Sequence, residues 1–247
     1  TKRKNNMPTL KELYDIAVQS GIDADPRTRA GVEATLARRN KEYNALSAER
    51  KTEYDQEDLW DPYIDSGILH GDPSKEVKKI LAGIDIDASE VAVAGLLNQQ
   101  GAGIDLLVAH HPQGTGYAAL HEVMEMQAEN LANYGVPINV AEGVMRERID
   151  EVARKISPRN HTQAVDAARL LGLSFMCTHT MADNMVFAFL DKLFKEKNAE
   201  TVGDVMKILK EIPEYKEAMK GKAGPMIFSG SEKNKTGKIA PLEITGG

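Results

Sequence analysis

Cysteine is nearly absent from this chain of 247 residues, which contains only Cys177. A single cysteine excludes an internal disulfide and favours a reducing compartment. The sequence also lacks any apolar run near the ~18 residues of a membrane-spanning helix, and it shows no signal-peptide pattern. We therefore expect a cytoplasmic protein with no membrane partner.

An excess of positive charge is also lacking. The chain has 31 Lys and Arg against 37 Asp and Glu, which gives a formal net charge of -6. A general nucleic-acid binder needs surplus cations to displace counterions, so this balance argues against nucleic acid as a partner. With 42% hydrophobic and 28% charged residues, the composition is typical of a globular protein with a substantial core.

The first 75 residues are expected to form a helical N-terminal extension and connector. Thr9 and Glu12 have the spacing of a capping box ahead of an amphipathic helix. Pro26 stands at the favoured first position of a second helix. The opening residues 1–6 lack an initiator Met, and we set them aside as a leader or a remnant of cloning.

From about residue 76, short apolar runs alternate with amphipathic stretches. Strands are predicted at residues 77–86, 104–109, 136–140 and 173–178. Helices are predicted between and after them, at residues 90–99, 117–134, 143–156, 161–171 and 182–196. Such alternation predicts an α/β fold, with a mainly parallel sheet flanked by helices.

The last segment, residues 197–247, is expected to continue this fold and to be truncated. It contains two helical stretches, at 201–211 and 214–220, and two strand-like runs, at 225–229 and 238–244. This divides the chain into an N-terminal extension, an α/β core over 76–196 and the C-terminal segment.

The central feature of the chain is the stretch 104–116, IDLLVAHHPQGTG. An apolar run of this kind is typical of a buried parallel strand. His110 and His111 follow it directly, and Pro112 then prevents regular continuation. Because ligands bind at the carboxyl ends of strands in open α/β sheets, the two histidines stand where a site is expected.

Other polar side chains follow the other predicted strands in the same way. They are Asp85 and Asp87 at the end of the first strand, Glu142 after the third, and His179 and Asp183 after the fourth. Imidazoles and carboxylates together are ligands for Zn, Fe, Mn, Co or Ni. We predict a metal site at His110, His111 and Asp183, with His179 and Glu142 as weaker candidates and Asp85 and Asp87 weaker still. The alternative is that these are ordinary loop residues.

Three segments resemble the Nif-three-like family, the interacting factor 3 proteins, also described as GTP cyclohydrolase I type 2 homologues. They are residues 83–87 (GIDID), 105–112 (DLLVAHHP) and 179–183 (HTMAD), and the resemblance covers about residues 76–195. It implies a dinuclear metal centre on an α/β scaffold within a ring-shaped homo-oligomer. It also implies that His110, His111 and Asp183 are ligands.

In that family the remaining ligands come from a C-terminal segment with a Gly-His pair and a nearby acidic residue. No histidine follows His179 in this chain, so Glu142 or His179 could take their place. The resemblance leads us to expect a metal-dependent, GTP cyclohydrolase-like hydrolase that acts on an unidentified small molecule. The alternative is a non-catalytic metal-binding scaffold or a protein that regulates a partner.

Overall fold

The computed structural model describes residues 7–241, so the leader residues 1–6 and residues 242–247 lie outside the described part. The described chain divides into two compact units, the first ending at Met185 and the second beginning at Val186. The first unit contains the sheet and every residue of the candidate site.

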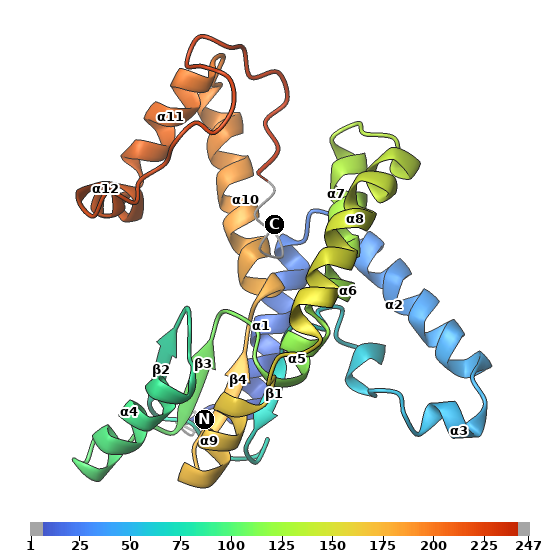
Figure 1. Cartoon of the computed structure of the whole chain (residues 1–247), viewed down its shortest axis with the longest axis vertical. Coiled ribbons are helices and arrows are strands. Elements are labelled where there is room, and N and C mark those ends of the chain that lie inside the picture. The colour runs from blue at the N-terminus through green and yellow to red at the C-terminus, as the bar shows by residue number, and fades with distance from the viewer. Residues whose placement is uncertain (1–6, 242–247) are drawn as a thin grey trace, which may run out of the picture. The chain divides into compact units, whose positions relative to one another are not determined.

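One four-stranded sheet organises the first unit (Figure 1). Its strands are β1 (Gly67–His70), β2 (Ile80–Gly83), β3 (Leu106–Ala109) and β4 (Ser174–Cys177), in the order β1-β4-β3-β2. The pairs β2–β3 and β3–β4 are parallel, whereas β1 runs antiparallel to β4. The predicted α/β class with a mainly parallel sheet is therefore confirmed. Parallel pairing places the carboxyl ends of β2, β3 and β4 at one edge of the sheet.

Helices precede the sheet and fill the connections between its strands. In chain order they are α1 (Leu10–Ala24), α2 (Thr28–Ala45), α3 (Ala48–Lys51), the 3-10 helix η1 (Glu57–Leu59), α4 (Ala88–Gln99), α5 (Gly114–Ala118), α6 (Leu120–Val123), α7 (Glu125–Asn133), α8 (Ile138–Ile156), α9 (Gln163–Leu171) and α10 (Thr180–Lys197). The last of these continues into the second unit.

The core lies between the sheet and the helices on its two faces. Leu107 and Phe175 share a buried cluster with residues of α4 and α9, which lie together against the sheet in Figure 1. Side chains alternate along a strand, so Ser174 points away from Phe175. A Cβ added to Gly71 would lie within 3.2 Å of both Ser174 and Leu10 of α1. The fully buried residues of α1 therefore cover the second face.

The N-terminal extension is tied to the sheet. The predicted capping box is present, because the Thr9 side chain accepts from the Glu12 amide and the Glu12 carboxylate accepts from the Thr9 amide. Such a cap contributes about 1 kcal/mol to helix stability. Residues 67–70, expected to be part of a connector, form β1 of the sheet. The described part of residues 1–75 therefore belongs to the same compact unit as the strands.

The strand predicted at residues 136–140 is wrong. Pro137 is the N-cap of α8, and Ile138 is its first residue. The β-branched residues favoured a strand locally, but the buried positions Ala141, Ile149 and Ile156 have helical spacing. Ile138 and Val140 remain 46% and 47% exposed at the start of this helix. The helix predicted from residue 143 therefore begins five residues earlier.

The second unit is built from the end of α10, α11 (Val202–Glu211) and α12 (Pro213–Lys220). Leu190, Phe194 and Ile208 form its buried cluster. The strands predicted at 225–229 and 238–241 are wrong: these residues are irregular, and residues 242–244 lie outside the described chain. Met226 and Phe228, in the first of these segments, are 60% and 92% exposed.

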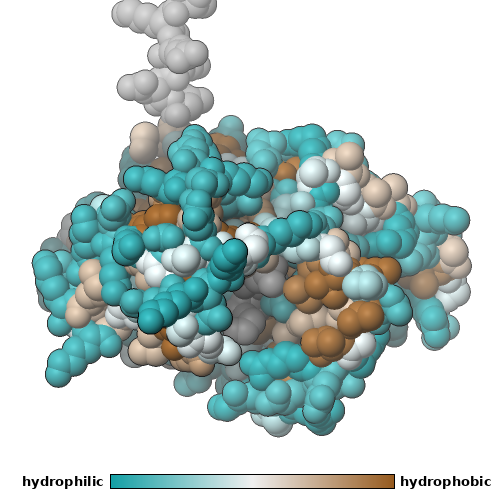
Figure 2. Space-filling view, turned by 90° about the horizontal axis from the view of Figure 1, so that it is seen from above, coloured by the Kyte–Doolittle hydropathy of each residue, from teal (hydrophilic) through white to brown (hydrophobic). Residues whose placement is uncertain are grey.

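Hydrophilic side chains cover most of the face drawn in Figure 2, with apolar residues in smaller areas. This agrees with a composition in which 28% of residues are charged. Within residues 7–241, the helices are all too short or too polar to cross a bilayer.

Candidate metal site

Three predicted side chains converge at the carboxyl edge of the sheet. His110 directly follows β3, His179 follows β4 by one residue, and Asp183 lies in the first turn of α10. One ligand atom from each residue can be chosen so that all three lie within 4.8 Å of one another. The His110 Nε2 atom is 3.3 Å from Asp183 Oδ1, and His179 Nε2 is 3.8 Å from Asp183 Oδ2. This cluster could hold a metal ion.

The orientation of His179 is determined by Asp65. The Nδ1–H of His179 donates to Asp65 Oδ2 at 2.7 Å, and the Thr180 hydroxyl donates to the same oxygen at 2.6 Å. The His179 backbone N–H donates to Ser66 Oγ at 2.9 Å. The Asp65 and His179 side chains are only 0% and 4% exposed. Because Nδ1 is engaged with the carboxylate, Nε2 is directed toward Asp183.

His110 is held in a similar way by a backbone carbonyl. Its Nδ1–H donates to the carbonyl oxygen of Thr178 at 3.3 Å. Its Nε2 atom is therefore left facing the carboxylate of Asp183. Histidine ligands of metal ions usually donate the other ring N–H to a carboxylate or to a backbone carbonyl. Both histidines of the cluster have this arrangement.

The donor set fits a cation. If His110 is neutral and donates from Nδ1, the Nε2 lone pair faces a carboxylate oxygen, and this contact is repulsive unless a proton or a metal ion lies between them. Burial lowers the pKa of His110 more than the charge of Asp183 raises it, which disfavours the proton. Burial also lowers the pKa of His179, but Asp65 and Asp183 outweigh it, and the net pKa is raised. A site with two imidazoles and a carboxylate suits divalent first-row metals.

His111 lies beside this cluster but points toward a different carboxylate. Its Nδ1 is 2.6 Å from Asp85 Oδ1, and both side chains are exposed. Its ring centroid is 5.3 Å from that of His110 and 6.1 Å from that of His179. The chain bends at His110 and His111, as the following Pro112 predicted, so both adjacent histidines lie at the same sheet edge.

Asp87 and Glu142, which were also predicted as ligands, are not part of the cluster of His110, His179 and Asp183. Asp87 is the N-cap of α4 and accepts from Gln113 Nε2 at 3.1 Å. Glu142 lies in α8, where it lines a cavity with Arg27 and Arg38. The structure does not bring Glu142 to the cluster of His110, His179 and Asp183, because the strand expected to end beside it is a helix.

Cys177 lies close to the site, but its thiol is unreactive. Its thiol is buried and lies 3.4 Å from the His110 carbonyl oxygen and 3.5 Å from that of His111. Burial and the charge of Asp65 raise the thiol pKa, so the sulfur stays protonated. Because the thiolate is the reactive form, this residue packs under the site without acting as a nucleophile.

Asp65 is the residue that sequence reasoning missed. It stands two residues before β1, in a segment expected to be only a connector. Its separation from His179 matches no local pattern. The only signal was an acidic residue beside a short apolar stretch, which is common at strand ends.

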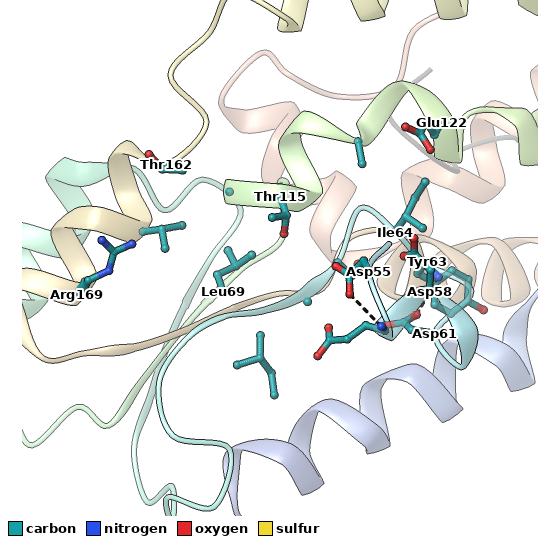
Figure 3. Close-up of a pocket in the computed structure, with 17 residues that line it drawn as sticks. Asp55, Asp58, Asp61, Tyr63, Ile64, Leu69, Thr115, Glu122, Thr162 and Arg169 are labelled. Atoms are coloured by element: carbon teal, nitrogen blue, oxygen red, sulfur yellow. Dashed lines mark hydrogen bonds between the residues drawn. The ribbon is translucent and has the colours of Figure 1, made fainter. Parts of the chain in front are cut away.

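Two cavities lie near these elements. One of about 730 Å³ is lined by His111 and His179 of the site region. Another, of about 570 Å³, is lined by carboxylates and Arg169 (Figure 3). Burial raises the pKa of Asp61 in this second cavity to about 7, although hydrogen bonds from Tyr14 and Tyr63 oppose the shift. His110, His179 and Asp183 do not line it, so the first cavity is the one associated with the candidate metal ligands.

Comparison with known proteins supports the fold. No protein-family model matches the chain, and a search of curated proteins returned no match. Among solved structures, a NIF3 superfamily protein from Sphaerobacter thermophilus matches with a TM-score of 0.63 and 20% sequence identity. The match covers 92% of this chain and 70% of that chain. The chain therefore has the fold of a NIF3 superfamily protein, as the resemblance of its motifs predicted.

Proposed function

We propose that this protein is a metal-dependent hydrolase of a small molecule, and that it holds two divalent metal ions at the carboxyl edge of its sheet. The observation that carries the proposal is the convergence of two Nε2 atoms on the Asp183 carboxylate, with each Nδ1 already engaged. His110, His179 and Asp183 would hold the first ion. The fold shared with a NIF3 superfamily protein agrees with this proposal.

His111 is proposed as a ligand of the second ion. Its Nδ1 already contacts the Asp85 carboxylate, as Nδ1 of His179 contacts Asp65. No hydrogen bond to its Nε2 atom occurs among residues 7–241, so that nitrogen is available to a ligand. Completion of this half of the site requires further ligands, because within the described chain the only metal-type cluster is that of His110, His179 and Asp183.

The chemistry divides between the ions and the chain. A bound divalent cation supplies Lewis acidity, which lowers the pKa of water and polarises a carbonyl or phosphoryl oxygen. Asp65 keeps the proton of His179 on Nδ1, so that Nε2 presents its lone pair. The Thr178 carbonyl does the same for His110, and Asp183 supplies the negative charge that favours a cation.

Metal content tests this proposal. The wild type and the variants His110→Ala, His179→Ala and Asp183→Ala are purified without chelating resin, and bound metals are counted by plasma mass spectrometry. His70→Ala serves as a control, because this histidine belongs to β1 and not to the cluster. We expect two metals per chain in the wild type and the control, with loss in each cluster variant. One metal per chain would contradict the second ion, and none in the wild type would contradict the site.

Turnover separates catalysis from metal binding alone. The metal-loaded protein is assayed with a panel of phosphate esters and purine nucleotides, and we expect hydrolysis that disappears in His110→Ala. Bound metal without turnover of any panel member would instead support a non-catalytic metal-binding scaffold.

A further inference from the structure

The cavity beside the candidate ligands has the dimensions of a small-molecule site. Its volume of about 730 Å³ lies within the roughly 300–1,000 Å³ of typical ligand pockets. His111 and His179 lie in its wall together with Tyr117, Arg159 and Gln163. A molecule bound there would therefore contact the edge of the proposed metal site.

The charged side chains in the cavity wall differ in whether they have a hydrogen-bond partner. Asp85 is engaged by His111, and Asp87 accepts from Gln113 and caps α4. Both carboxylates keep their negative charge, but each has a partner. Arg159 supplies the positive charge of this wall, and its exposed side chain forms no ion pair or hydrogen bond within residues 7–241. Within the described residues, the cavity wall thus contains two carboxylates that each have a hydrogen-bond partner and one guanidinium that has none.

Arg159 lies on a segment whose backbone is well anchored. The Arg159 amide donates to the Ile156 carbonyl at 2.9 Å, and His161 Nε2 contacts the same oxygen at 2.9 Å. The His161 carbonyl accepts from the Gly114 amide at 2.8 Å, which ties this loop to the start of α5. The Tyr117 ring packs edge-on against the His161 ring, with centroids 5.3 Å apart. The backbone that carries Arg159 is therefore linked through His161 to Tyr117, and both Arg159 and Tyr117 line the cavity.

We propose that this cavity binds a small molecule through an oxyanion, a phosphoryl or carboxylate group, that Arg159 contacts. A planar guanidinium matches the two oxygens of such a group and binds it through paired, charge-assisted hydrogen bonds. The rest of the molecule extends past Tyr117 toward His111 and His179. This inference rests on the proposed function, for which it names the substrate class.

Phenylphosphonate and benzoate serve as probes, because neither can be hydrolysed and each has a ring that can pack on Tyr117. Their affinities are measured by calorimetry on the full chain, in zinc-loaded and metal-free form. The variant is Arg159→Gln, with Arg159→Lys as the conservative change. Arg154→Gln is the matched control, since Arg154 is also an exposed arginine of the α8 region but does not line the cavity.

We expect Arg159→Gln to weaken probe binding by about tenfold or more, the usual contribution of a charge-assisted contact. Arg154→Gln should match the wild type, and Arg159→Lys should retain part of the affinity. A stronger effect with phenylphosphonate identifies a phosphoryl substrate, and a stronger effect with benzoate identifies a carboxylate. Equal affinity in Arg159→Gln and the wild type would overturn the proposal. The proposal would also fail if neither probe binds to the wild type.

Metal content of the same samples separates this result from the proposed function. Wild-type levels of zinc in Arg159→Gln, with weakened probe binding, support both. If the wild type takes up no zinc, the metal site fails, yet probe binding that depends on Arg159 in the metal-free protein still supports the oxyanion subsite.

Discussion

The carboxylate of Asp65 lies 2.7 Å from Nδ1 of His179, although 114 positions separate the two residues in sequence. Both side chains are buried, and the contact joins the segment before β1 to the end of β4. It leaves Nε2 of His179 facing the proposed metal ions. Asp65 therefore acts on the site through His179, without belonging to the ligand cluster.

Asp65→Asn should weaken metal binding by roughly 10–100-fold, the usual effect of altering the partner of a histidine ligand. The asparagine keeps the size of the side chain but removes the charge that holds the proton on Nδ1. Zinc affinity is measured by competition with a chelator. Asp150→Asn, at an exposed position of α8, is the control and should bind zinc as the wild type does. Unchanged affinity in Asp65→Asn would refute the role given to this carboxylate.

Gly116→Ala should also weaken metal binding, through the backbone of Asp65. A Cβ at Gly116 would lie 2.6 Å from the Asp65 carbonyl oxygen and 2.8 Å from its carbonyl carbon. Backbone cannot give way as a flexible side chain does, so Asp65 must shift relative to His179. The variant should lose about 1–3 kcal/mol of stability, the usual cost of overpacking.

The matched control for this change is Gly143→Ala. Gly143 lies in α8, and a Cβ there meets nothing within 4 Å. Since alanine favours a helix over glycine, this variant should gain up to about 1 kcal/mol of stability. Chemical denaturation and zinc affinity are compared for both variants. If Gly116→Ala behaves like the control, the close approach to Asp65 has no functional consequence.

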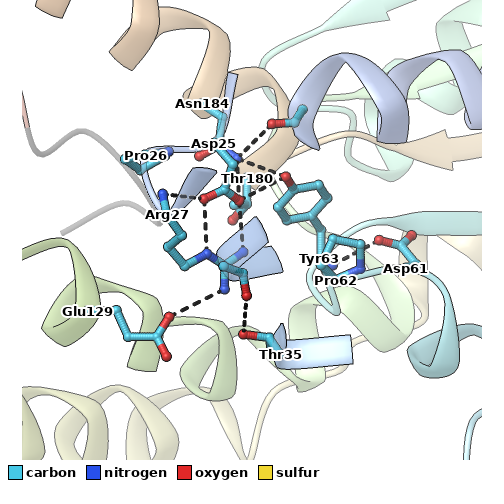
Figure 4. Close-up of polar contacts among 12 residues, drawn as sticks. Asp25, Pro26, Arg27, Thr35, Asp61, Pro62, Tyr63, Glu129, Thr180 and Asn184 are labelled. Carbon is cyan, nitrogen blue, oxygen red and sulfur yellow. Dashed lines mark hydrogen bonds and ion pairs between the residues drawn. The ribbon is translucent and has the colours of Figure 1, made fainter. Parts of the chain in front are cut away.

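Asn184→Ala should destabilise the first unit by roughly 2–4 kcal/mol. Asn184 is fully buried, and its Nδ2 lies 3.2 Å from the Gly21 carbonyl oxygen, 3.2 Å from Asp25 Oδ2 and 3.1 Å from the Tyr63 hydroxyl (Figure 4). Alanine would remove this donor from the Gly21 carbonyl and from the network of Asp25 and Tyr63, in which Asp25 Oδ2 still accepts from Arg27 and Tyr63. Thermal and denaturant unfolding measure the loss.

Met185→Ala is the control for this prediction, because Met185 is the next residue of α10 and is 53% exposed. It should change the free energy of unfolding by less than about 0.5 kcal/mol. Comparable losses in the two variants would show that the polar network adds nothing to the stability of this helix.

The contribution of Asp61 to stability should fall as pH rises from about 4 to about 7. Burial raises the pKa of this carboxyl from its ordinary 3.8 to about 7. Between these values the folded chain holds a proton that the unfolded chain releases, so deprotonation favours unfolding. The expected slope is roughly 1 kcal/mol per pH unit.

The free energy of unfolding of the wild type and Asp61→Asn is measured by denaturation across this pH range. The asparagine cannot titrate, so the advantage of the wild type over the variant should shrink with rising pH. A difference between the two proteins that does not vary with pH would show that Asp61 titrates normally in the folded state.

The sequence by itself determined the class of the fold and much of the candidate site. Apolar runs predicted β3 and β4, and in a parallel sheet this alone places His110 and His179 at one edge. The spacing of Thr9 and Glu12 predicted the cap of α1 because the interaction is local. These inferences succeeded where the necessary information lies within a few neighbouring residues.

Tertiary structure decided the rest. The β-branched stretch at 136–140 became the start of α8, which separated Glu142 from the cluster. Asp65 reaches His179 only because β1 pairs antiparallel with β4. The physical reason is that caps and periodicity depend on neighbours in the chain, whereas the partner of a buried ring nitrogen depends on which distant strands pair. Packing, and not local pattern, therefore determines the direction in which the imidazoles of this site point.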